Sequence, residues 1–176
     1  MKLHAIPILL AVVAGLSAST VQAATTGILT FRGQISAGTC NLAGGDVSRT
    51  ITLPPVKISD FDGINWAGNH EFDISADCES DIRNVIFLFA GTPSAGNGGL
   101  FSSTGTSANT GLWLMHRTPS LPTIPANGSA AQRSITVATS SRKAVLPLTA
   151  RYAATGLGAI RQGTLVSTLT VSITYN

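Results

Sequence analysis

Apolar and polar side chains alternate along the last part of the chain, residues 163–176. The apolar residues Leu165, Leu169, Val171, Ile173 and Tyr175 share one parity, and serine and threonine residues fill most of the other. A period of two predicts a β-strand with one buried face. The expected strand is about 12 residues long, against ~5 to 6 for a typical strand. It is either an ordinary strand docked on a core or a long strand whose edge pairs with a partner.

A second alternating segment spans residues 25–40. One face carries Leu29, Phe31, Gly33 and Ile35, and the other carries Thr30, Arg32, Gln34 and Ser36. This pattern predicts another strand with one apolar face. A glycine inside such a face marks the close approach of another backbone or side chain, which we expect at Gly33.

Shorter strands are expected between these two segments. Their ranges are 48–53, 72–78, 85–90, 112–116, 132–138 and 146–152. The unbroken apolar run 85–90 predicts a central strand covered on both faces, and Pro147 indicates a strand edge or a bulge. Residues 60–69 and 92–110 carry the glycines and polar residues of loops. About eight short strands without a helical period predict an all-β sandwich in one domain.

The first 23 residues have the pattern of a secretory signal peptide. Lys2 gives a positive start, residues 6–16 are apolar, and residues 21–23 include the small residues typical of a cleavage site. The apolar run is too short for a bilayer, which needs ~20 residues. We therefore expect export of a mature chain of residues 24–176. Its small positive charge forms no basic run, which argues against nucleic-acid and membrane-surface binding.

The mature part contains two cysteines, Cys40 and Cys78. In an oxidising compartment an even pair indicates one disulfide. A two-cysteine metal site and a catalytic thiol are the alternatives. The chain has no CxxC spacing, and His70 and His116 are not close to either cysteine in sequence. The disulfide is therefore the favoured interpretation.

The sequence offers little for catalysis. His70 and His116 lie at expected strand ends, and Asp60 and Asp62 sit in a loop, where carboxylates commonly form turns. No GxSxG elbow is present, and Arg161 stands where a dinucleotide-binding loop needs its last glycine. We therefore expect no enzymatic activity and no cofactor.

Two tryptophans support an alternative function, a secreted carbohydrate-binding sandwich. Trp66 lies in a polar loop and Trp113 lies inside an apolar run. With nearby polar loops they could form a stacking site for a sugar. We expect Trp113 in the core, whereas Trp66 could serve equally as a core residue or as a binding platform.

Four segments, in order along the mature chain, resemble one family. They are 29–35 running into Cys40, the 72–74 approach to Cys78, the segment 148–153, and Gly163 followed by alternating residues up to the penultimate Tyr175. Together with a signal peptide and two cysteines, they are similar to the pilin subunits of chaperone/usher fimbriae.

The resemblance implies an immunoglobulin-like sandwich that lacks its seventh strand, leaving a hydrophobic groove beside the last strand. Residues 24–36 would form a donor-strand extension, and residues 37–176 the pilin domain. Leu29, Phe31, Gly33 and Ile35 would be the inserted face. The groove strand would contain Gly163, Leu165, Leu169, Val171, Ile173, Tyr175 and Asn176.

The partners that the resemblance implies are a periplasmic chaperone, an outer-membrane usher and neighbouring pilin subunits. The chaperone would hold the carboxylate of Asn176 with basic residues and fill the groove until the next subunit's extension replaces it. The chain would then be a structural subunit that is exported through the periplasm to the surface fimbrium and supports adhesion. Ser167 departs from the apolar pattern of the groove strand.

Overall fold

The computed structural model describes residues 27–176, so the expected signal peptide lies outside the described residues. The described part divides into two units, residues 27–35 and Ser36–Asn176. No helix among residues 27–176 is long and apolar enough to cross a membrane. The only helix of this part is a short 3₁₀ turn, η1 (Ile58–Phe61).

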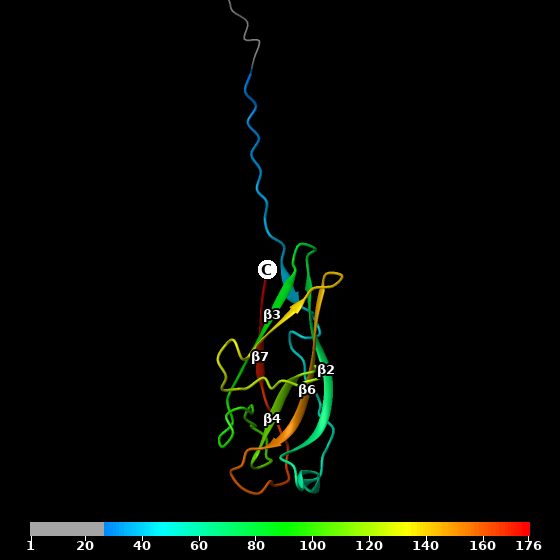
Figure 1. Cartoon of the computed structure of the whole chain (residues 1–176), viewed down its shortest axis with the longest axis vertical. Coiled ribbons are helices and arrows are strands. Elements are labelled where there is room, and N and C mark those ends of the chain that lie inside the picture. Colours follow the sequence, from blue (N-terminus) through cyan, green and yellow to red (C-terminus); the bar gives the residue numbers. More distant parts are fainter. Residues whose placement is uncertain (1–26) are drawn as a thin grey trace, which may run out of the picture. The chain divides into compact units, whose positions relative to one another are not determined.

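Residues Ser36–Asn176 form two antiparallel sheets (Figure 1). The first sheet has the order β1 (Cys40–Leu42), β2 (Trp66–Cys78), β6 (Lys143–Ala154) and β4 (Thr110–His116). The second has the order β5 (Ser134–Ala138), β3 (Asn84–Gly91) and β7 (Leu169–Tyr175). The predicted all-β sandwich of immunoglobulin type is therefore confirmed.

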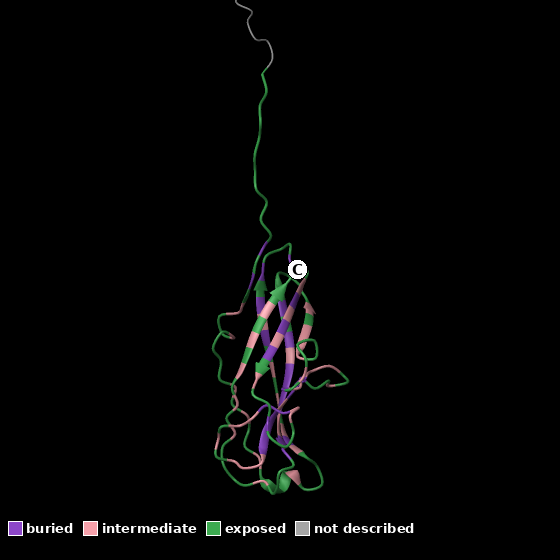
Figure 2. Ribbon diagram, turned by 90° about the vertical axis from the view of Figure 1, so that its left-hand side faces the viewer, coloured by how far each residue is buried: buried purple, intermediate pink, exposed green. Residues whose placement is uncertain are grey.

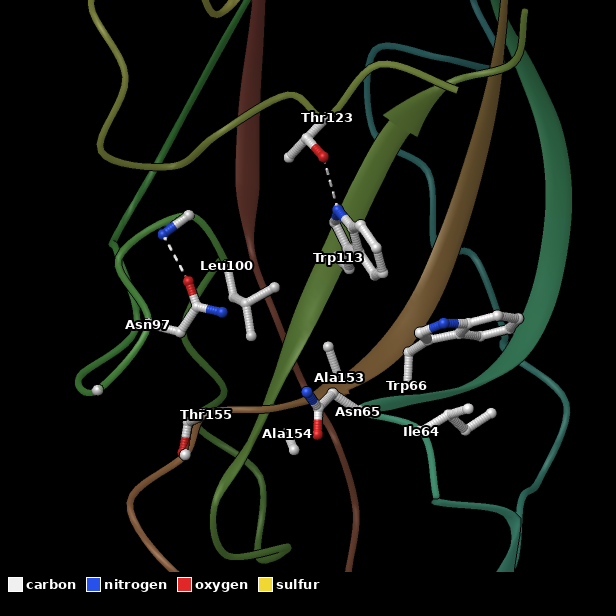
Figure 3. A pocket seen from close by; sticks show the side chains of 13 residues that line it. Ile64, Asn65, Trp66, Asn97, Leu100, Trp113, Thr123, Ala153, Ala154 and Thr155 are labelled. Carbon is white, nitrogen blue, oxygen red and sulfur yellow. Dashed lines mark hydrogen bonds between the residues drawn. The ribbon is translucent and has the colours of Figure 1, made fainter. Parts of the chain in front are cut away.

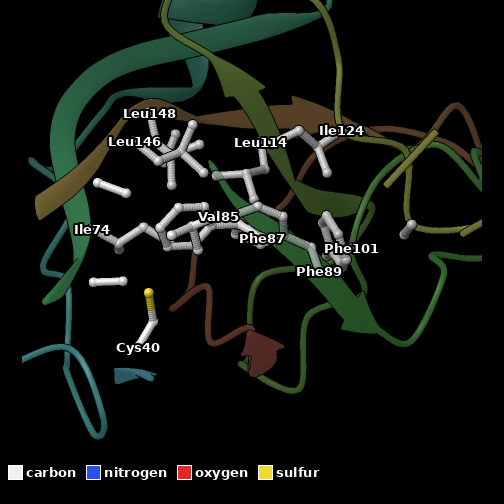
Figure 4. Packing of buried hydrophobic residues seen from close by; sticks show 14 of the residues in the cluster. Cys40, Ile74, Val85, Phe87, Phe89, Phe101, Leu114, Ile124, Leu146 and Leu148 are labelled. Carbon is white, nitrogen blue, oxygen red and sulfur yellow. The ribbon is translucent and has the colours of Figure 1, made fainter. Parts of the chain in front are cut away.

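The core lies between the two sheets and follows the period of the strands. Val85, Phe87 and Phe89 project from β3, and every second residue of β6 from Ala144 to Ala150 projects toward them (Figure 4). Figure 2 shows the resulting alternation of buried and more exposed residues along the strands. Phe101 and Ile124, from the loops beside β4, close the cluster.

β3 is central, as predicted, because it pairs with both β5 and β7. Its second face is less covered than expected, since Ile86 and Leu88 are only half-buried. The expected edge position of Pro147 is wrong, because β6 is central in its sheet. The carbonyl of Pro147 accepts a hydrogen bond from Arg117 N–H, just beyond the end of β4. In an antiparallel strand the N–H and C=O of one residue point to the same side. The N–H that Pro147 lacks would therefore point toward β4, at a position just beyond the last residue of β4, so no hydrogen bond of the ladder is lost.

Two loop and strand predictions need correction. Residues 48–53 form no strand, and β2 begins at Trp66, inside the expected loop 60–69. The register between β2 and β6 shifts between Ala67 and His70. Such a bulge puts an extra residue into one strand and interrupts the alternation on which the sequence prediction depended. The alternation of apolar and polar residues therefore does not reveal where β2 begins.

The last strand is shorter than expected. β7 covers Leu169–Tyr175, whereas residues 163–168 bond mainly to the loop 103–107 and join no strand. Ser107 N–H donates to the carbonyl of Thr164, and Thr104 N–H donates to the carbonyl of Val166. The carbonyl groups of Thr164 and Val166 thus point to the same side as those of β7 that bond to β3, but residues 163–168 do not have regular strand geometry.

The predicted disulfide is confirmed. Cys40 and Cys78 are bonded, with an S–S distance of 2.02 Å, and they face each other in the register of β1 and β2. No free cysteine occurs among the described residues. The alternatives of a two-cysteine metal site and a catalytic thiol therefore fail.

Candidate functional site

The free edge of β7 is the first feature of the site. Among the strands of the described residues, β7 pairs only with β3. Asn84, which begins β3, and Asn176, which follows β7, donate to each other's carbonyl oxygens at 3.2 Å. In an antiparallel ladder such hydrogen-bonded pairs alternate with unbonded pairs. The even-numbered residues of β7 therefore bond to β3. The N–H and C=O groups of the odd-numbered residues, from Leu169 to Tyr175, point away from β3 toward the free edge.

The same odd-numbered residues carry the apolar side chains. Leu169, Val171 and Ile173 pack against the core but are only half-buried, while Thr170, Ser172 and Thr174 are exposed. Leu165 continues this row. The inward face predicted from the sequence is therefore confirmed for these four apolar residues. One row of residues thus presents both unpaired main-chain groups and incompletely covered apolar side chains.

Tyr175 differs from the rest of the row, because it is 39% exposed. It is the last residue of β7, and no strand among residues 27–176 pairs with β7 on its open side. β1 comes near β7, with Cα atoms within 8 Å, but it belongs to the other sheet and does not pair with β7. Leu42, at the end of β1, is half-buried against the core as well.

Gly163 sits where the chain enters this row. A Cβ atom at this position would lie 2.5 Å from the carbonyl carbon of Thr106 and 2.7 Å from Ser107 Cα, and its φ is +155°. Only glycine avoids both the clash and the strain. Main-chain and side-chain bonds to Thr164 fix the contact, including Thr164 N–H to Thr106 Oγ1 at 3.0 Å. Gly163 thereby lets the loop 103–107 hold the beginning of the row.

Ser167 is the polar exception in the row. Its side chain is half-buried, and its hydroxyl oxygen has no hydrogen-bond partner among the described residues. A buried hydroxyl without a partner costs about 1 to 3 kcal/mol. The structure therefore leaves one unsatisfied polar group next to the free edge.

Residues 27–35 form the second feature. They contain no strand, so the strand predicted for 25–40 is wrong over residues 27–39, and only Cys40 enters β1. A strand requires a hydrogen-bonded neighbour, and this segment has none within the described chain. Large apolar side chains are exposed along it: Ile28 95%, Leu29 82%, Phe31 89% and Ile35 100%. A Cβ atom at Gly33 would meet nothing within 4 Å, so the close approach expected there stays a prediction.

The residues considered for catalysis do not converge. Asp60 Oδ2 accepts a hydrogen bond from Lys57 N–H at 2.8 Å, and so caps the 3₁₀ turn. His70 stacks near Phe72, with 6.3 Å between ring centroids. Partial burial lowers the pKa of His116 below its ordinary value of 6.5. No group of three or more possible metal-binding side chains occurs among the described residues.

The structure brings Trp66 and Trp113 together, although they are far apart in the sequence. The prediction that Trp113 lies in the core is wrong, because it is only half-buried. Its neighbours Leu112 and Leu114 belong to the core cluster, so Trp113 points to the opposite face of the sheet. An apolar run hid this alternation, since all three side chains are hydrophobic. The two rings line one pocket with Ala153 (Figure 3).

The two antiparallel sheets define an immunoglobulin-like fold of the pilin type. The model of the family described as "Fimbrial protein" matches residues 29–176, and the chain belongs to this family. No curated protein matches the sequence.

Solved structures of pilus subunits share the fold. A structure of a chaperone–usher pilus that addresses rod uncoiling matches with a TM-score of 0.63 and 17% identity, covering 86% of this chain and 96% of its own. The P pilus rod subunit PapA matches with a TM-score of 0.61 and 14% identity, covering 78% of this chain and 99% of its own. The CupB6 tip adhesin from Pseudomonas aeruginosa gives a TM-score of 0.50 at 19% identity, with 62% of this chain and 31% of the adhesin covered.

Proposed function

We propose that this chain is a structural, non-catalytic subunit of a chaperone–usher fimbria and that it polymerises by donor-strand exchange. The free edge of β7 carries the proposal. Its odd-numbered residues combine unpaired main-chain groups with half-buried Leu169, Val171 and Ile173. This combination suits β-augmentation, in which main-chain bonds give affinity and alternate side chains give specificity.

The donor would be residues 24–36 of the next subunit. Leu29, Phe31, Gly33 and Ile35 share one parity, and the three large side chains among them are almost fully exposed in the isolated chain. Burying these three is worth about 5 to 9 kcal/mol gross, at ~1.5 to 3 kcal/mol each. Gly33, which has no side chain, would let the donor strand approach the groove closely at one position. The hydroxyl of Ser167 would gain a hydrogen-bond partner on the inserted donor strand.

A periplasmic chaperone would occupy the same edge before assembly and would contact the row from Gly163 to Asn176. An outer-membrane usher would then exchange the chaperone for the next subunit. The segment 1–23 would direct export, and the fimbrium at the cell surface would be the final location. Membership of the fimbrial family and the pilin-type fold support this order of partners.

Replacement of Phe31 by aspartate tests the donor role. A charge on the inserted face would have to be desolvated without a partner, so Phe31→Asp should abolish incorporation into fibres while periplasmic chaperone binding stays normal. Gln34→Asp is the matched control, because Gln34 has the opposite parity. Fibres are measured by electron microscopy and by immunoblotting of sheared surface protein, and the chaperone complex by co-purification.

Each result has a clear meaning. Normal fibres from Phe31→Asp would overturn the donor role. Loss of fibres from both variants would overturn the assignment of the inserted face. A synthetic peptide of residues 25–36, with and without the same substitutions, separates donor function from folding. Only the wild-type and Gln34→Asp peptides should raise the melting temperature of the subunit.

A further inference from the structure

The pocket at Trp66 and Trp113 lies in the part of the sandwich remote from the end of β7. Trp66 pairs with Ala153 at the beginning of β2, whereas the other end of β2 carries Cys78. Asn176 bonds to Arg83 and Asn84, shortly after Cys78. The pocket has a volume of about 670 Å³, in the usual range of small-molecule sites. None of the residues that line it belongs to the row from Gly163 to Asn176 that is proposed for polymerisation.

Both tryptophans project from the outer face of the four-stranded sheet, the face turned away from β3, β5 and β7. Trp113 on β4 lies directly opposite Arg151 on β6, and Trp66 on β2 lies directly opposite Ala153. Arg151 and Ala153 have the parity opposite to the core residues Leu148 and Ala150. Residues directly opposite in a ladder share a face. The small Ala153 thus forms a floor between the two indole rings (Figure 3).

Specific contacts fix the orientation of both rings. Trp113 Nε1–H donates to Thr123 Oγ1 at 2.9 Å. The guanidinium carbon of Arg151 lies 4.0 Å from the centre of the Trp66 ring and 5.8 Å from that of Trp113. Arg151 Nε–H donates in turn to Asn69 Oδ1 at 2.9 Å. Cation–π contacts of this kind are worth about 0.5 to 1 kcal/mol at exposed sites. Rings held in place before binding lose little entropy when a ligand arrives.

Polar groups surround the rings. Asn65, Asn97, Thr123 and Thr155 line the same pocket. The amide oxygen of Asn97 accepts from Gly99 N–H at 3.1 Å, which leaves its NH₂ group as a donor. Thr155 is 5% exposed, and its hydroxyl has no hydrogen-bond partner among the described residues. Native structures rarely leave such a group unsatisfied, so its presence in the wall indicates a site that a ligand or water completes.

We propose that this pocket is a carbohydrate-binding subsite that takes one pyranose ring. A pyranose has an apolar face of C–H groups, which suits the electron-rich face of an indole ring. Its hydroxyl groups suit amide and hydroxyl side chains such as Asn65 and Asn97. Arg151 holds Trp66 in position, and the positively charged guanidinium group of Arg151 lies over the face of the Trp66 ring. The subunit would therefore bind sugar through its own pilin domain, in addition to any structural role.

Saturation-transfer NMR with defined sugars tests this inference. The probes are the methyl pyranosides of glucose, galactose, mannose, N-acetylglucosamine and N-acetylneuraminic acid, each added to the mature chain. At least one should receive saturation from the protein and should change the tryptophan fluorescence. Trp113→Ala should weaken its binding by about tenfold or more, as is usual when an aromatic anchor is truncated. Trp113→Phe keeps an aromatic face and should retain most of the affinity.

Val145→Ala is the matched control, because Val145 is an exposed residue of β6 remote from the pocket. Its affinity should equal that of the wild type. Circular dichroism verifies that each variant is folded. Absence of binding for all five sugars, or equal affinity in folded Trp113→Ala, would overturn the inference. Neither result would affect the polymerisation proposal, whose peptide test uses the row from Gly163 to Asn176, which shares no residue with the pocket.

Discussion

Gly163→Ala is the substitution for which the structure gives the sharpest expectation. The new Cβ would fall 2.5 Å from the carbonyl carbon of Thr106 and 2.7 Å from Ser107 Cα. Both neighbours are main-chain atoms, so no side chain can move aside. A non-glycine residue at φ +155° adds strain of about 1 to 3 kcal/mol.

The alternative to strain is separation of residues 163–166 from the loop 103–107. That separation would break the bonds of Thr164 with Ser107 N–H at 3.0 Å and with Thr106 N–H at 3.2 Å. Each bond contributes about 0.5 to 1.5 kcal/mol net. The chain will take the less costly of the two routes, or a mixture of them. We therefore expect a loss of about 1 to 3 kcal/mol in the free energy of unfolding.

Urea unfolding of the disulfide-bonded chain, followed by tryptophan fluorescence, measures the change. Gly45→Ala is the control, because a Cβ at Gly45 would meet nothing within 4 Å and its φ is not positive. The control should stay within about 0.5 kcal/mol of the wild type. If Gly163→Ala is as stable as Gly45→Ala, the close approach of the loop 103–107 does not hold the start of the last strand.

Three further outcomes are expected. Replacing Cys40 and Cys78 together by serine should lower the unfolding free energy by about 4 kcal/mol, because the bond closes a loop with a sequence separation of 38; an unchanged urea midpoint would contradict a stabilising disulfide. Deleting residues 173–176 should abolish capture by the chaperone in a co-purification assay, since two odd-numbered edge residues are lost; an unchanged complex would remove this part of the row from the chaperone site. Burial holds the pKa of His116 in the folded state below 6.5, so the folded state binds fewer protons than the unfolded state. The contribution of His116 to the free energy of unfolding is therefore complete above pH 6.5 and decreases as the pH falls toward the lower pKa of the folded state. His116→Gln should flatten this dependence, and an equally steep pH profile of the urea midpoint in that variant would assign it to another group.

The fold could be predicted from the sequence where apolar and polar residues alternate along a strand with one buried face. The alternation of Leu169, Val171 and Ile173 gave both the strand and its inward side, because a half-covered edge strand keeps its outer face polar. The disulfide was predicted because an even pair of cysteines in an exported chain forms one bond, and β1 and β2 place the two residues directly opposite each other. Composition and period therefore sufficed for the sandwich of two sheets, whereas the free edge was one of two alternatives that the period left open and was favoured only by the family resemblance.

Other features depend on contacts that a single sequence does not encode locally. The bulge near Gly68 hid the start of β2, and an all-apolar run hid the outward face of Trp113. The pocket with Trp66 exists only because β6 lies between β2 and β4. Residues 27–35 carry the pattern of a strand without forming one, since strand formation requires a neighbour that the chain does not supply.

The position of the disulfide has a mechanical consequence. β1 has only three residues, and a pull on the preceding segment would peel so short a strand from the sheet one hydrogen bond at a time. The covalent bond from Cys40 passes that tension to Cys78, at the end of the 13-residue β2. β2 pairs with β6 along most of its length, so a long ladder of hydrogen bonds anchors the point to which the tension passes. In a fibre built from such subunits, the disulfide would couple the segment before Cys40 to the four-stranded sheet, so that the short β1 alone would not have to bear the tension.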